Sequence, residues 1–276
     1  MNPDHRHPPL FEVKEVSYVY AGRFIALDRV SLSIWPGERV AILGANGSGK
    51  STLLKLLDGL YFPTQGEVHF QGRLLSEAAF EDEDFAFDFR RRVSLIFQDA
   101  DIQLFSPTVW DEVAFGPLQL GLSRDEVIAR TQAALAALGI ARLRERTPYQ
   151  LSGGEKRKVA IASVLSLGPE VWLMDEPTAG LDPRSQSWLV DFICQEGERG
   201  HTVVTATQDL DIVADIADRV LVFSEDHRLV AEGTPVDILS DRDLLLRCNL
   251  IHEHRHRHAE MEHAHLHVHT GEHSHD

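Results

Sequence analysis

The sequence has few cysteines, a deficit of basic residues and no long apolar run. Its 276 residues include two cysteines, Cys194 and Cys248, which are too few and too far apart for a disulfide framework. No stretch approaches the roughly 18 consecutive apolar residues that a transmembrane helix requires. Residues 1–9 are polar and lack the apolar core of a signal peptide. These absences exclude a disulfide-stapled scaffold and predict a soluble, cytoplasmic protein.

The net charge argues against one class of binding partner, nucleic acid. Acidic residues outnumber Lys and Arg by 43 to 27, a formal net charge of -16. A field of that sign opposes general nucleic-acid binding. Hydrophobic residues at 43% and charged residues at 25% are typical of a globular chain. The histidines are unevenly placed, because ten of the 15 fall between His252 and His275. We therefore expect a flexible N-terminus at 1–9, a globular domain at 10–250 and a histidine-rich, disordered tail at 251–276.

The hydrophobic pattern predicts strands that alternate with helices. Residues 11–20 and 26–34 alternate apolar and polar side chains, as half-buried strands do. Shorter apolar strands are predicted at 39–43, 93–97, 171–174, 201–206 and 219–223, and helices at 53–57, 123–143, 153–167, 185–195 and 210–217. This order indicates an α/β fold with a mostly parallel sheet and an antiparallel β-subdomain. We interpret the acidic, aromatic segment 76–92 as a solvated surface excursion.

A phosphate-binding loop follows the strand at 39–43. The pattern Gly44-x-x-x-x-Gly49-Lys50-Ser51 matches a P-loop in full, between a predicted strand and a predicted helix. Its main-chain N–H groups and the helix N-terminus can cradle phosphate oxygens, Lys50 can reach the outer phosphates, and Ser51 can bind Mg²⁺. The candidate ATP-binding residues here are Gly44, Asn46, Gly47, Ser48, Gly49, Lys50, Ser51 and Thr52.

Two acidic residues end the apolar strand at 171–174. Asp175 is placed to orient the magnesium ion, and Glu176 to orient and deprotonate an attacking water. A surface acidic pair is the alternative interpretation, which the presence of the P-loop disfavours. The sequence thus predicts an ATPase with ATP and Mg²⁺ as ligands.

Further motifs resemble those of ATP-binding cassette (ABC) proteins. Leu151-Ser-Gly-Gly-Glu155 is similar to the signature motif, Gln98 to the Q-loop residue, Ala179-Gly-Leu-Asp182 to the D-loop, and Tyr20 to the aromatic residue on which adenine stacks. The resemblance covers about residues 10–240 and implies a P-loop NTPase (RecA-like) fold with an inserted helical subdomain at about 100–160. It further implies that Gln98 serves catalysis and magnesium, and that Ser152, Gly153, Gly154 and Asp182 contact nucleotide across a head-to-tail homodimer.

The chain departs from the family's pattern at one position. The strand after the D-loop usually ends in a histidine that contacts the γ-phosphate, and Gln208 stands at that position here. A glutamine amide can donate a hydrogen bond to phosphate but cannot carry a proton or a positive charge. We expect hydrolysis to survive through Glu176 and Lys50, with slow turnover as a possible cost.

A narrower resemblance lies between Gln98 and Leu122. The stretches Gln103-Leu-Phe105 and Ala114-Phe-Gly-Pro117 look like those of the ATPases of energy-coupling factor (ECF) transporters. In that group this region borders the groove that receives coupling helices of an integral membrane subunit. The alternative is a helical subdomain that serves another importer class. Either way the resemblance implies a position at the cytoplasmic face of the membrane.

Alternating histidines dominate the tail. Imidazole suits Ni²⁺, Co²⁺, Cu²⁺ and Zn²⁺, and the candidate ligands are His252, His254, His256, His258, His263, His265, His267 and His269. A cloning tag and an idle native tail are the alternatives. Beside an ECF-like ATPase, the tail favours the energising subunit of a nickel or cobalt importer. An ATPase for a vitamin importer, or a soluble ABC ATPase acting on nucleic acid or ribosomes, remains the competing interpretation.

Overall fold

The computed structural model describes residues 8–258 and 261–268, and the side chains of 8–252. The chain divides into two compact units. The first comprises Met1–Leu75 with Ile193–Asp276, and the second comprises Ser76–Phe192. Among the described residues, no helix is both long and apolar enough to cross a bilayer.

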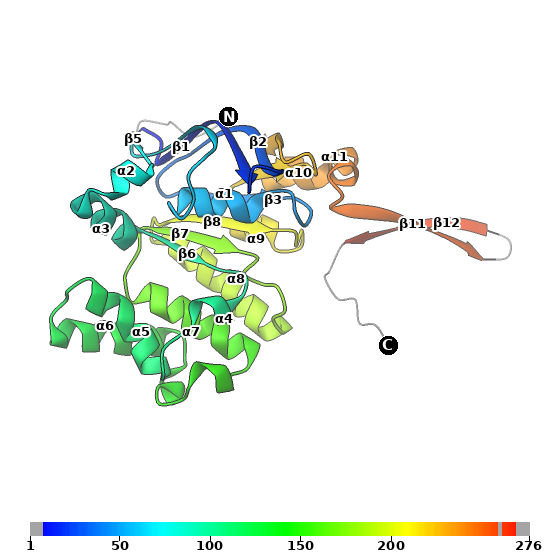
Figure 1. Ribbon diagram of the computed structural model, residues 1–276. Helices are drawn as coiled ribbons and strands as arrows, with labels where there is room; N and C mark the ends of the chain where they lie inside the picture. Colours follow the sequence, from blue (N-terminus) through cyan, green and yellow to red (C-terminus); the bar gives the residue numbers. More distant parts are fainter. Residues whose placement is uncertain (1–7, 259–260, 269–276) are drawn as a thin grey trace. The chain divides into compact units, whose positions relative to one another are not determined.

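The first unit contains an antiparallel sheet and a mostly parallel one (Figure 1). Strands β1 (Phe11–Tyr20), β2 (Phe24–Ile34), β4 (Gln65–Phe70) and β5 (Arg73–Leu74) form the antiparallel sheet in the order β2-β1-β4-β5. In the other sheet β3 (Arg39–Leu43) pairs in parallel with β8 (Thr202–Thr207) and with β9 (Arg219–Phe223), and β10 (Leu229–Gly233) pairs antiparallel with β9. This confirms the predicted fold class.

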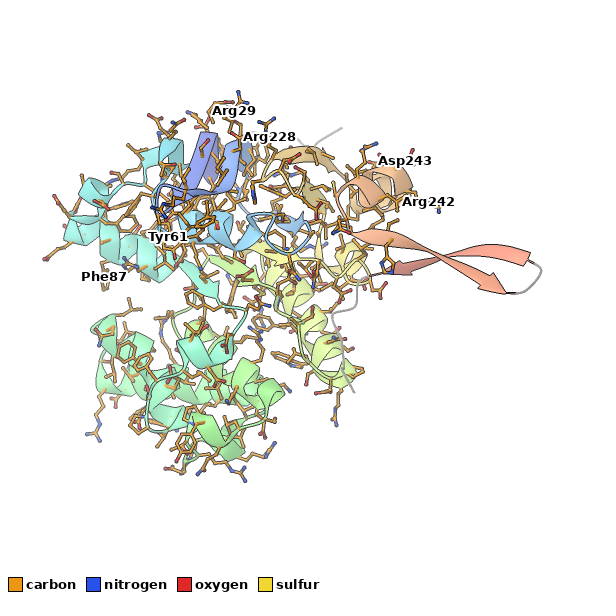
Figure 2. The ribbon with its side chains drawn as sticks, turned by 45° about the vertical axis from the view of Figure 1, so that its right-hand side comes forward. Arg29, Tyr61, Phe87, Arg228, Arg242 and Asp243 are labelled. Carbon is orange, nitrogen blue, oxygen red and sulfur yellow. The ribbon has the colours of Figure 1, made fainter. Side chains whose placement is uncertain are left out.

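Helices of the first unit follow these strands. They are α1 (Lys50–Leu57), α9 (Val213–Ile216), α10 (Pro235–Ser240) and α11 (Arg242–Arg247). The helix predicted at 210–217 is shorter in the structure, a single turn. An ion pair links two distant segments of this unit, since Arg228 donates to Asp28 at 2.7 Å. Arg29 approaches the same carboxylate at 3.5 Å (Figure 2), and the Arg228 hydrogen bond is the main cause that lowers the pKa of Asp28.

The second unit contains two parallel strands and most of the helices. Strands β6 (Val93–Ile96) and β7 (Val171–Asp175) pair with Val93 opposite Val171. The α-helices are α2 (Glu77–Phe80), α3 (Glu83–Arg92), α4 (Ala100–Gln103), α5 (Val109–Gln119), α6 (Arg124–Ala137), α7 (Gly153–Leu165) and α8 (Pro183–Glu198), the last of which ends in the first unit. Short 3₁₀ turns lie at Ala141–Leu143 and Pro148–Gln150. Helices α5, α6 and α7 pack on one another (Figure 1).

The segment 76–92 lies at the surface, as its acidic residues suggest, and only Phe89 is buried. It forms α2 and α3, and Phe80 packs on Phe85 and Phe89 with ring centroids 5.4 Å and 5.2 Å apart. Phe89 is buried, whereas Phe87 on the same helix is exposed (Figure 2). The aromatic contacts have a simple cause, since Phe85 and Phe89 are four residues apart and so share a helix face.

Part of the histidine-rich segment, for which we predicted a disordered tail, has a described backbone. The backbone at β11 (Ile251–His258) and β12 (Met261–Val268) forms an antiparallel two-stranded sheet. Residues 269–276 lie outside the described part of the chain, as do residues 1–7, for which we predicted flexibility.

Candidate nucleotide-binding and catalytic site

The P-loop connects β3 to α1 in the first unit. Lys50 is the first residue of α1 and is buried, and its Nζ donates hydrogen bonds to the carbonyl oxygens of Gly44 and Ala45 at 2.8 Å and 3.2 Å. The lysine therefore closes the loop on itself. The same amine is placed at the N-terminal end of a helix, where the main-chain N–H groups attract an anion.

Two glycines of this loop are required by their surroundings. Gly49 has φ +106°, and a Cβ there would lie 2.2 Å from the carbonyl oxygen of Ala26. A Cβ on Gly44 would lie 2.4 Å from the hydroxyl of Ser48. A larger residue at Gly49 would therefore clash with the main chain of β2, and one at Gly44 would displace the Ser48 hydroxyl. The conformation that lets the N–H groups converge thus depends on these glycines.

The loop offers what a phosphate group needs. The Ser48 hydroxyl is buried and has no hydrogen-bond partner within the part of the chain that the structure describes. A buried hydroxyl of this kind costs free energy unless a ligand or water satisfies it. Together with Lys50 and the N-terminus of α1, it makes a set of donors that fits the triphosphate of ATP, and Ser51 adds a hydroxyl of the type that Mg²⁺ accepts.

Tyr20 lies beside the P-loop helix. Its hydroxyl is 3.1 Å from the hydroxyl of Thr52. Its ring meets Tyr18 edge-on at 4.9 Å, and Tyr18 stacks on Tyr61 at 5.3 Å. Tyr61 lies beside α1 (Figure 2). Burial raises the pKa of Tyr18, with Tyr20 and Tyr61 adding to the effect. The three tyrosines form an apolar platform next to the phosphate loop, and the role of Tyr20 in adenine stacking stays a prediction.

Gln208 is brought to the P-loop by the parallel strands. Leu43 at the end of β3 pairs with Thr207 at the end of β8, so the segments that follow both strands leave the same edge of the sheet. Gln208 and Asn46 line one cavity of about 150 Å³ with Glu225, Asn249 and Leu250. Gln208, which occupies the position of the family's histidine, therefore lies beside the phosphate loop.

In the second unit, the candidate magnesium and catalytic residues meet at the ends of β6 and β7. Ile96 pairs with Met174, so Gln98 and the pair Asp175 and Glu176 follow neighbouring strand ends. Both acidic residues are 6% exposed. Glu176 has φ +41°, which is strained for a residue with a Cβ. Strain of this kind costs about 1–3 kcal/mol and is concentrated at functional sites.

Arg157 is a residue of this site that the sequence did not reveal. It lies on α7, is buried, and donates hydrogen bonds to the carbonyl oxygens of Phe97 and Gln98. Burial lowers the pKa of Arg157, while the negative charges of Asp175 and Asp99 oppose that shift. The guanidinium thus holds the segment that contains Gln98. Among three consecutive basic residues at the start of a helix, nothing in the sequence distinguishes this one.

Ser152 caps the helix that carries Arg157. Its hydroxyl accepts from the Glu155 N–H at 3.3 Å, and Glu155 Oε2 accepts from the Ser152 N–H at 3.2 Å, a capping box. The Ser152 N–H hydrogen bond is the largest cause that lowers the pKa of Glu155; burial opposes it, and Arg142 adds to the lowering. Ser152 and Gly153 are exposed, so the N-terminal end of α7 is open to a ligand.

Gly154 and Asp182 lie close together within the second unit. Asp182 accepts hydrogen bonds from the N–H groups of Arg184 and Ser185, both at 3.1 Å, and from the Ser185 hydroxyl at 2.8 Å. The Ser185 hydrogen bond is the main cause that lowers the pKa of Asp182. A Cβ on Gly154 would be 3.0 Å from the Ser185 hydroxyl. The signature and D-loop segments are therefore in contact.

Most of the predicted nickel or cobalt ligands have side chains that lie outside the described part of the chain. The side chains of His254, His256, His258, His263, His265, His267 and His269 lie outside the described residues. Within the side chains that are described, no group of three His, Cys, Asp or Glu residues is arranged to hold a metal ion.

Comparison with known proteins identifies the family. The sequence profile described as ABC transporter matches residues 27–179. A protein of Methanosarcina acetivorans, provisionally named an ABC transporter ATP-binding protein, is 48% identical over 270 residues, which is 97% of this chain and 98% of that protein. The chain belongs to the ABC transporter ATP-binding proteins. It therefore hydrolyses ATP, and the P-loop and the acidic pair at β7 are parts of an ABC ATPase.

Two other relatives connect the chain to the ECF group. The nickel import ATP-binding protein NikO of Rhodobacter capsulatus is 48% identical over 246 residues, 88% of this chain and 96% of that protein. The energy-coupling factor transporter ATP-binding protein EcfA of Methanothermobacter thermautotrophicus is 40% identical over 241 residues, 87% of this chain and 76% of that protein. The ABC ATPase is thus closely related to ECF-type ATPases.

Solved structures of ABC ATPases have the same fold as this chain. The protein cbiO1 of Clostridium perfringens, described as part of the ABC transporter complex cbiONQ, superposes with a TM-score of 0.74 and 35% identity, over 88% of this chain and 96% of that one. The dimeric post-hydrolysis cassette MJ0796 with ADP and Pi gives a TM-score of 0.72 and 28% identity, over 82% and 98% of the two chains.

Proposed function

We propose that this ABC ATPase energises uptake of a transition metal ion, nickel or cobalt, through an integral membrane transporter. One observation carries the choice of substrate: ten histidines gather between His252 and His275 of a chain closely related to ECF-type ATPases. The names of NikO and of the cbiONQ complex describe those relatives, and they support the same choice of substrate.

The chemistry follows from the residues of each unit. Lys50 and the N–H groups of the P-loop bind the outer phosphates of ATP, and Ser51, Gln98 and Asp175 are the candidate holders of Mg²⁺. The ion, when bound, supplies Lewis acidity at a phosphoryl oxygen. Glu176 accepts the proton of the attacking water, because its buried carboxylate is held at the end of a strand and can act as a general base.

The working unit in this proposal is a head-to-tail homodimer. The exposed N-terminus of α7, with Ser152 and Gly153, is a second anion site on the chain. Ser152 of one subunit would contact the γ-phosphate held by Lys50 of the other. The dimeric MJ0796 cassette supports this arrangement by analogy.

Mixing two inactive variants tests the dimer. Ser152→Arg and Lys50→Ala subunits should form heterodimers with one intact composite site and one site damaged twice. We expect ATPase activity to reappear on mixing at roughly a quarter of the wild-type rate, provided that sites act independently and subunits exchange at random. Confirmed heterodimers without activity would show that each chain works alone, with Ser152 and Lys50 of the same chain serving one site.

A surface of the second unit fits the membrane partner. Ile102, Phe105, Phe115 and Leu118 are exposed, and the rings of Phe105 and Phe115 meet edge-on at 4.9 Å. Exposed apolar clusters of this kind are typical of protein interfaces. We infer that coupling helices dock here, at the cytoplasmic face of the membrane, in agreement with the ECF-like sequence between Gln98 and Leu122.

That surface is mechanically joined to the signature helix. Gln103 donates to the carbonyl oxygen of Ala160 on α7 at 3.1 Å, and Lys156 pairs with Asp101 at 2.6 Å. A displacement of α4 by a docked helix would therefore move α7, which carries Ser152 at its N-terminus. The vitamin importer shares this mechanism and differs only in the transported molecule.

Uptake by cells tests the substrate. Cells that lack this subunit are supplied with the wild-type chain or with Glu176→Gln, and accumulation of labelled nickel, cobalt and cobalamin is measured. We expect the wild type alone to restore uptake of nickel or cobalt. Restoration of cobalamin uptake without either metal ion would show that the transporter is a vitamin importer.

A further inference from the structure

The cavity beside the P-loop has one wall that the candidate nucleotide site does not explain. Its volume of about 150 Å³ has room for several water molecules. The residues that line it are Ala45, Asn46, Gln208, Glu225, Asn249 and Leu250. The P-loop and Gln208 belong to the candidate nucleotide site. Glu225 and Asn249 bring a carboxylate and an amide to the same cavity.

The strand pairing places Gln208 and Glu225 on opposite sides of the P-loop. Strand β3 lies between β8 and β9, and Leu43 at its end pairs in parallel with Thr207 and with Val222. Gln208 follows β8 and Glu225 follows β9, so both leave the edge of the sheet from which the P-loop starts. Since both line one cavity, the carboxylate and the Gln208 carboxamide stand across it from each other.

Asn249 holds the Glu225 carboxylate in this position. The Asn249 side-chain amide donates a hydrogen bond to Glu225 Oε1 at 3.0 Å. Asn249 has φ +55°, the left-handed conformation typical of the residue that ends a helix, and the Leu250 N–H closes α11 by donating to the Leu245 carbonyl oxygen at 2.9 Å. The Leu250 side chain is buried. The carboxylate is thus held by a capped helix end that is anchored in the core.

A carboxylate on one wall decides how the Gln208 carboxamide is oriented. A carboxamide has an NH₂ end that donates and an oxygen end that accepts. An ionised carboxylate only accepts, so Glu225 attracts the NH₂ end and repels the oxygen end, directly or through one water. The NH₂ group has two hydrogens, and the second can be donated to a phosphate oxygen. The orientation that Glu225 excludes is the one in which Gln208 would repel the phosphate.

We propose that Glu225 is a positioning residue for ATP hydrolysis, which together with Asn249 orients the Gln208 amide so that its Nε2 donates to the γ-phosphate. The proposal rests on the proposed role of the P-loop and Gln208 at the outer phosphates, and it does not depend on the transported substrate. By its charge alone, a carboxylate beside the P-loop weakens the binding of a triphosphate. Charge and orientation therefore predict opposite effects when the carboxylate is neutralised.

The substitution Glu225→Gln separates the two effects. It keeps the size of the side chain and an oxygen that can accept from Asn249, but it no longer imposes one orientation on Gln208. Asp226→Asn is the matched control, because it removes the same charge from the next residue of the turn, which is exposed and does not line the cavity. Steady-state ATPase rates and the Kd for ATP are measured on the purified full-length chains.

We expect the kcat of Glu225→Gln to fall at least about five-fold, while the Kd for ATP stays equal or becomes smaller. Both quantities should stay within about two-fold of the wild type in Asp226→Asn. In a Gln208→Ala background, Glu225→Gln should cause no further loss of kcat, because the amide through which it acts is gone. Asn249→Gly, which suits the left-handed backbone, should lower kcat and leave the melting temperature unchanged.

A wild-type kcat in Glu225→Gln, or an equal loss with and without the Gln208 amide, would overturn the proposal. An unchanged rate in Gln208→Ala would also overturn it, because Glu225 would then have no group to orient. Lys50→Ala distinguishes these results from a failure of the proposed nucleotide site. If that variant bound ATP as the wild type does, the assignment of the P-loop itself would be wrong.

Discussion

The guanidinium of Arg157 donates a hydrogen bond to the main-chain oxygen of Gln98. A second bond from the same group goes to the carbonyl oxygen of Phe97. Because Arg157 lies on the helix that Ser152 caps, the signature motif and the Gln98 segment are joined by one buried side chain. We infer that Arg157 positions Gln98 for its role beside the nucleotide.

The substitution Arg157→Met should slow hydrolysis much more than it weakens ATP binding. It removes the donor from two carbonyl oxygens, each of which costs about 1–3 kcal/mol if left unsatisfied in a buried site. We expect kcat to fall at least about ten-fold, equivalent to about 1.4 kcal/mol, while the Kd for ATP, which depends on the P-loop, changes little. Steady-state kinetics and nucleotide titration separate the two effects.

The neighbouring residue provides the matched control for Arg157. Lys156→Gln breaks the ion pair with Asp101, whose carboxylate is largely exposed, and exposed pairs contribute little. We expect kcat to stay within about two-fold of the wild type. Equal losses in the two variants, or no loss in Arg157→Met, would show that the buried hydrogen bonds do not position the Gln98 segment.

A second prediction concerns Lys50. Lys50→Ala deletes the cation that closes the P-loop and faces the outer phosphates, so most ATP affinity should be lost. Lys55→Ala on the same helix is the control, because its ammonium lies over the Tyr61 ring and away from the loop carbonyls. Fluorescent-nucleotide titration should show weak binding in the first variant only. Unchanged ATP affinity in Lys50→Ala would show that the P-loop does not bind the nucleotide.

Gln208→His is expected to leave hydrolysis intact or raise it. The substitution introduces the side chain usual in the family at a position that already lies beside Asn46 in the P-loop cavity. Imidazole can carry a positive charge toward a phosphate, which an amide cannot. The ATPase rate of the purified variant is the measurement. If turnover were abolished, the glutamine would have a function particular to this subfamily.

The P-loop could be predicted because its residues are contiguous. Strand, glycines, lysine and helix lie in one run from Arg39 to Leu57, and local geometry alone makes the site. Arg157 could not be predicted in this way, since its partners at Phe97 and Gln98 are about sixty residues away. Three consecutive basic residues look equivalent in the sequence, and only tertiary packing buries one of them.

The run of acids from Glu81 to Asp84 predicted a solvated segment, and these residues are exposed. They also favour a helix start, because they lie near its positive end. Phe80 then packs its ring against those of Phe85 and Phe89. In the tail, alternation predicted metal ligands, but the cross-strand register could not be deduced without the pairing of β11 and β12.

A pH effect is expected at the capping box of α7. The Ser152 N–H is the main cause of the lowered pKa of Glu155, so the folded chain favours the carboxylate. That contribution to stability is present above the ordinary pKa of a glutamic acid and is lost as the pH falls through the lowered value in the folded chain. Glu155→Gln should therefore lower the melting temperature at pH 7, and the difference from the wild type should shrink toward about pH 3.

An exposed glutamate serves as the comparison for this effect. Glu145 pairs with Arg144 at 3.0 Å on the surface, and Glu145→Gln should change the melting temperature little at either pH. A difference between wild type and Glu155→Gln that is the same at pH 7 and at pH 3 would mean that the carboxylate does not support the cap.

Trapping the ATP-bound state tests the central claim most directly. The claim is that Glu176 is the base of an ABC ATPase that works as a dimer. In Glu176→Gln the amide cannot accept the proton of water, while Lys50 still holds the phosphates. Light scattering on the purified variant should show a monomer without nucleotide and a dimer with ATP and Mg²⁺, with hydrolysis reduced by at least about a hundred-fold. A variant that stays monomeric at saturating ATP, or hydrolyses ATP at the wild-type rate, would contradict the account.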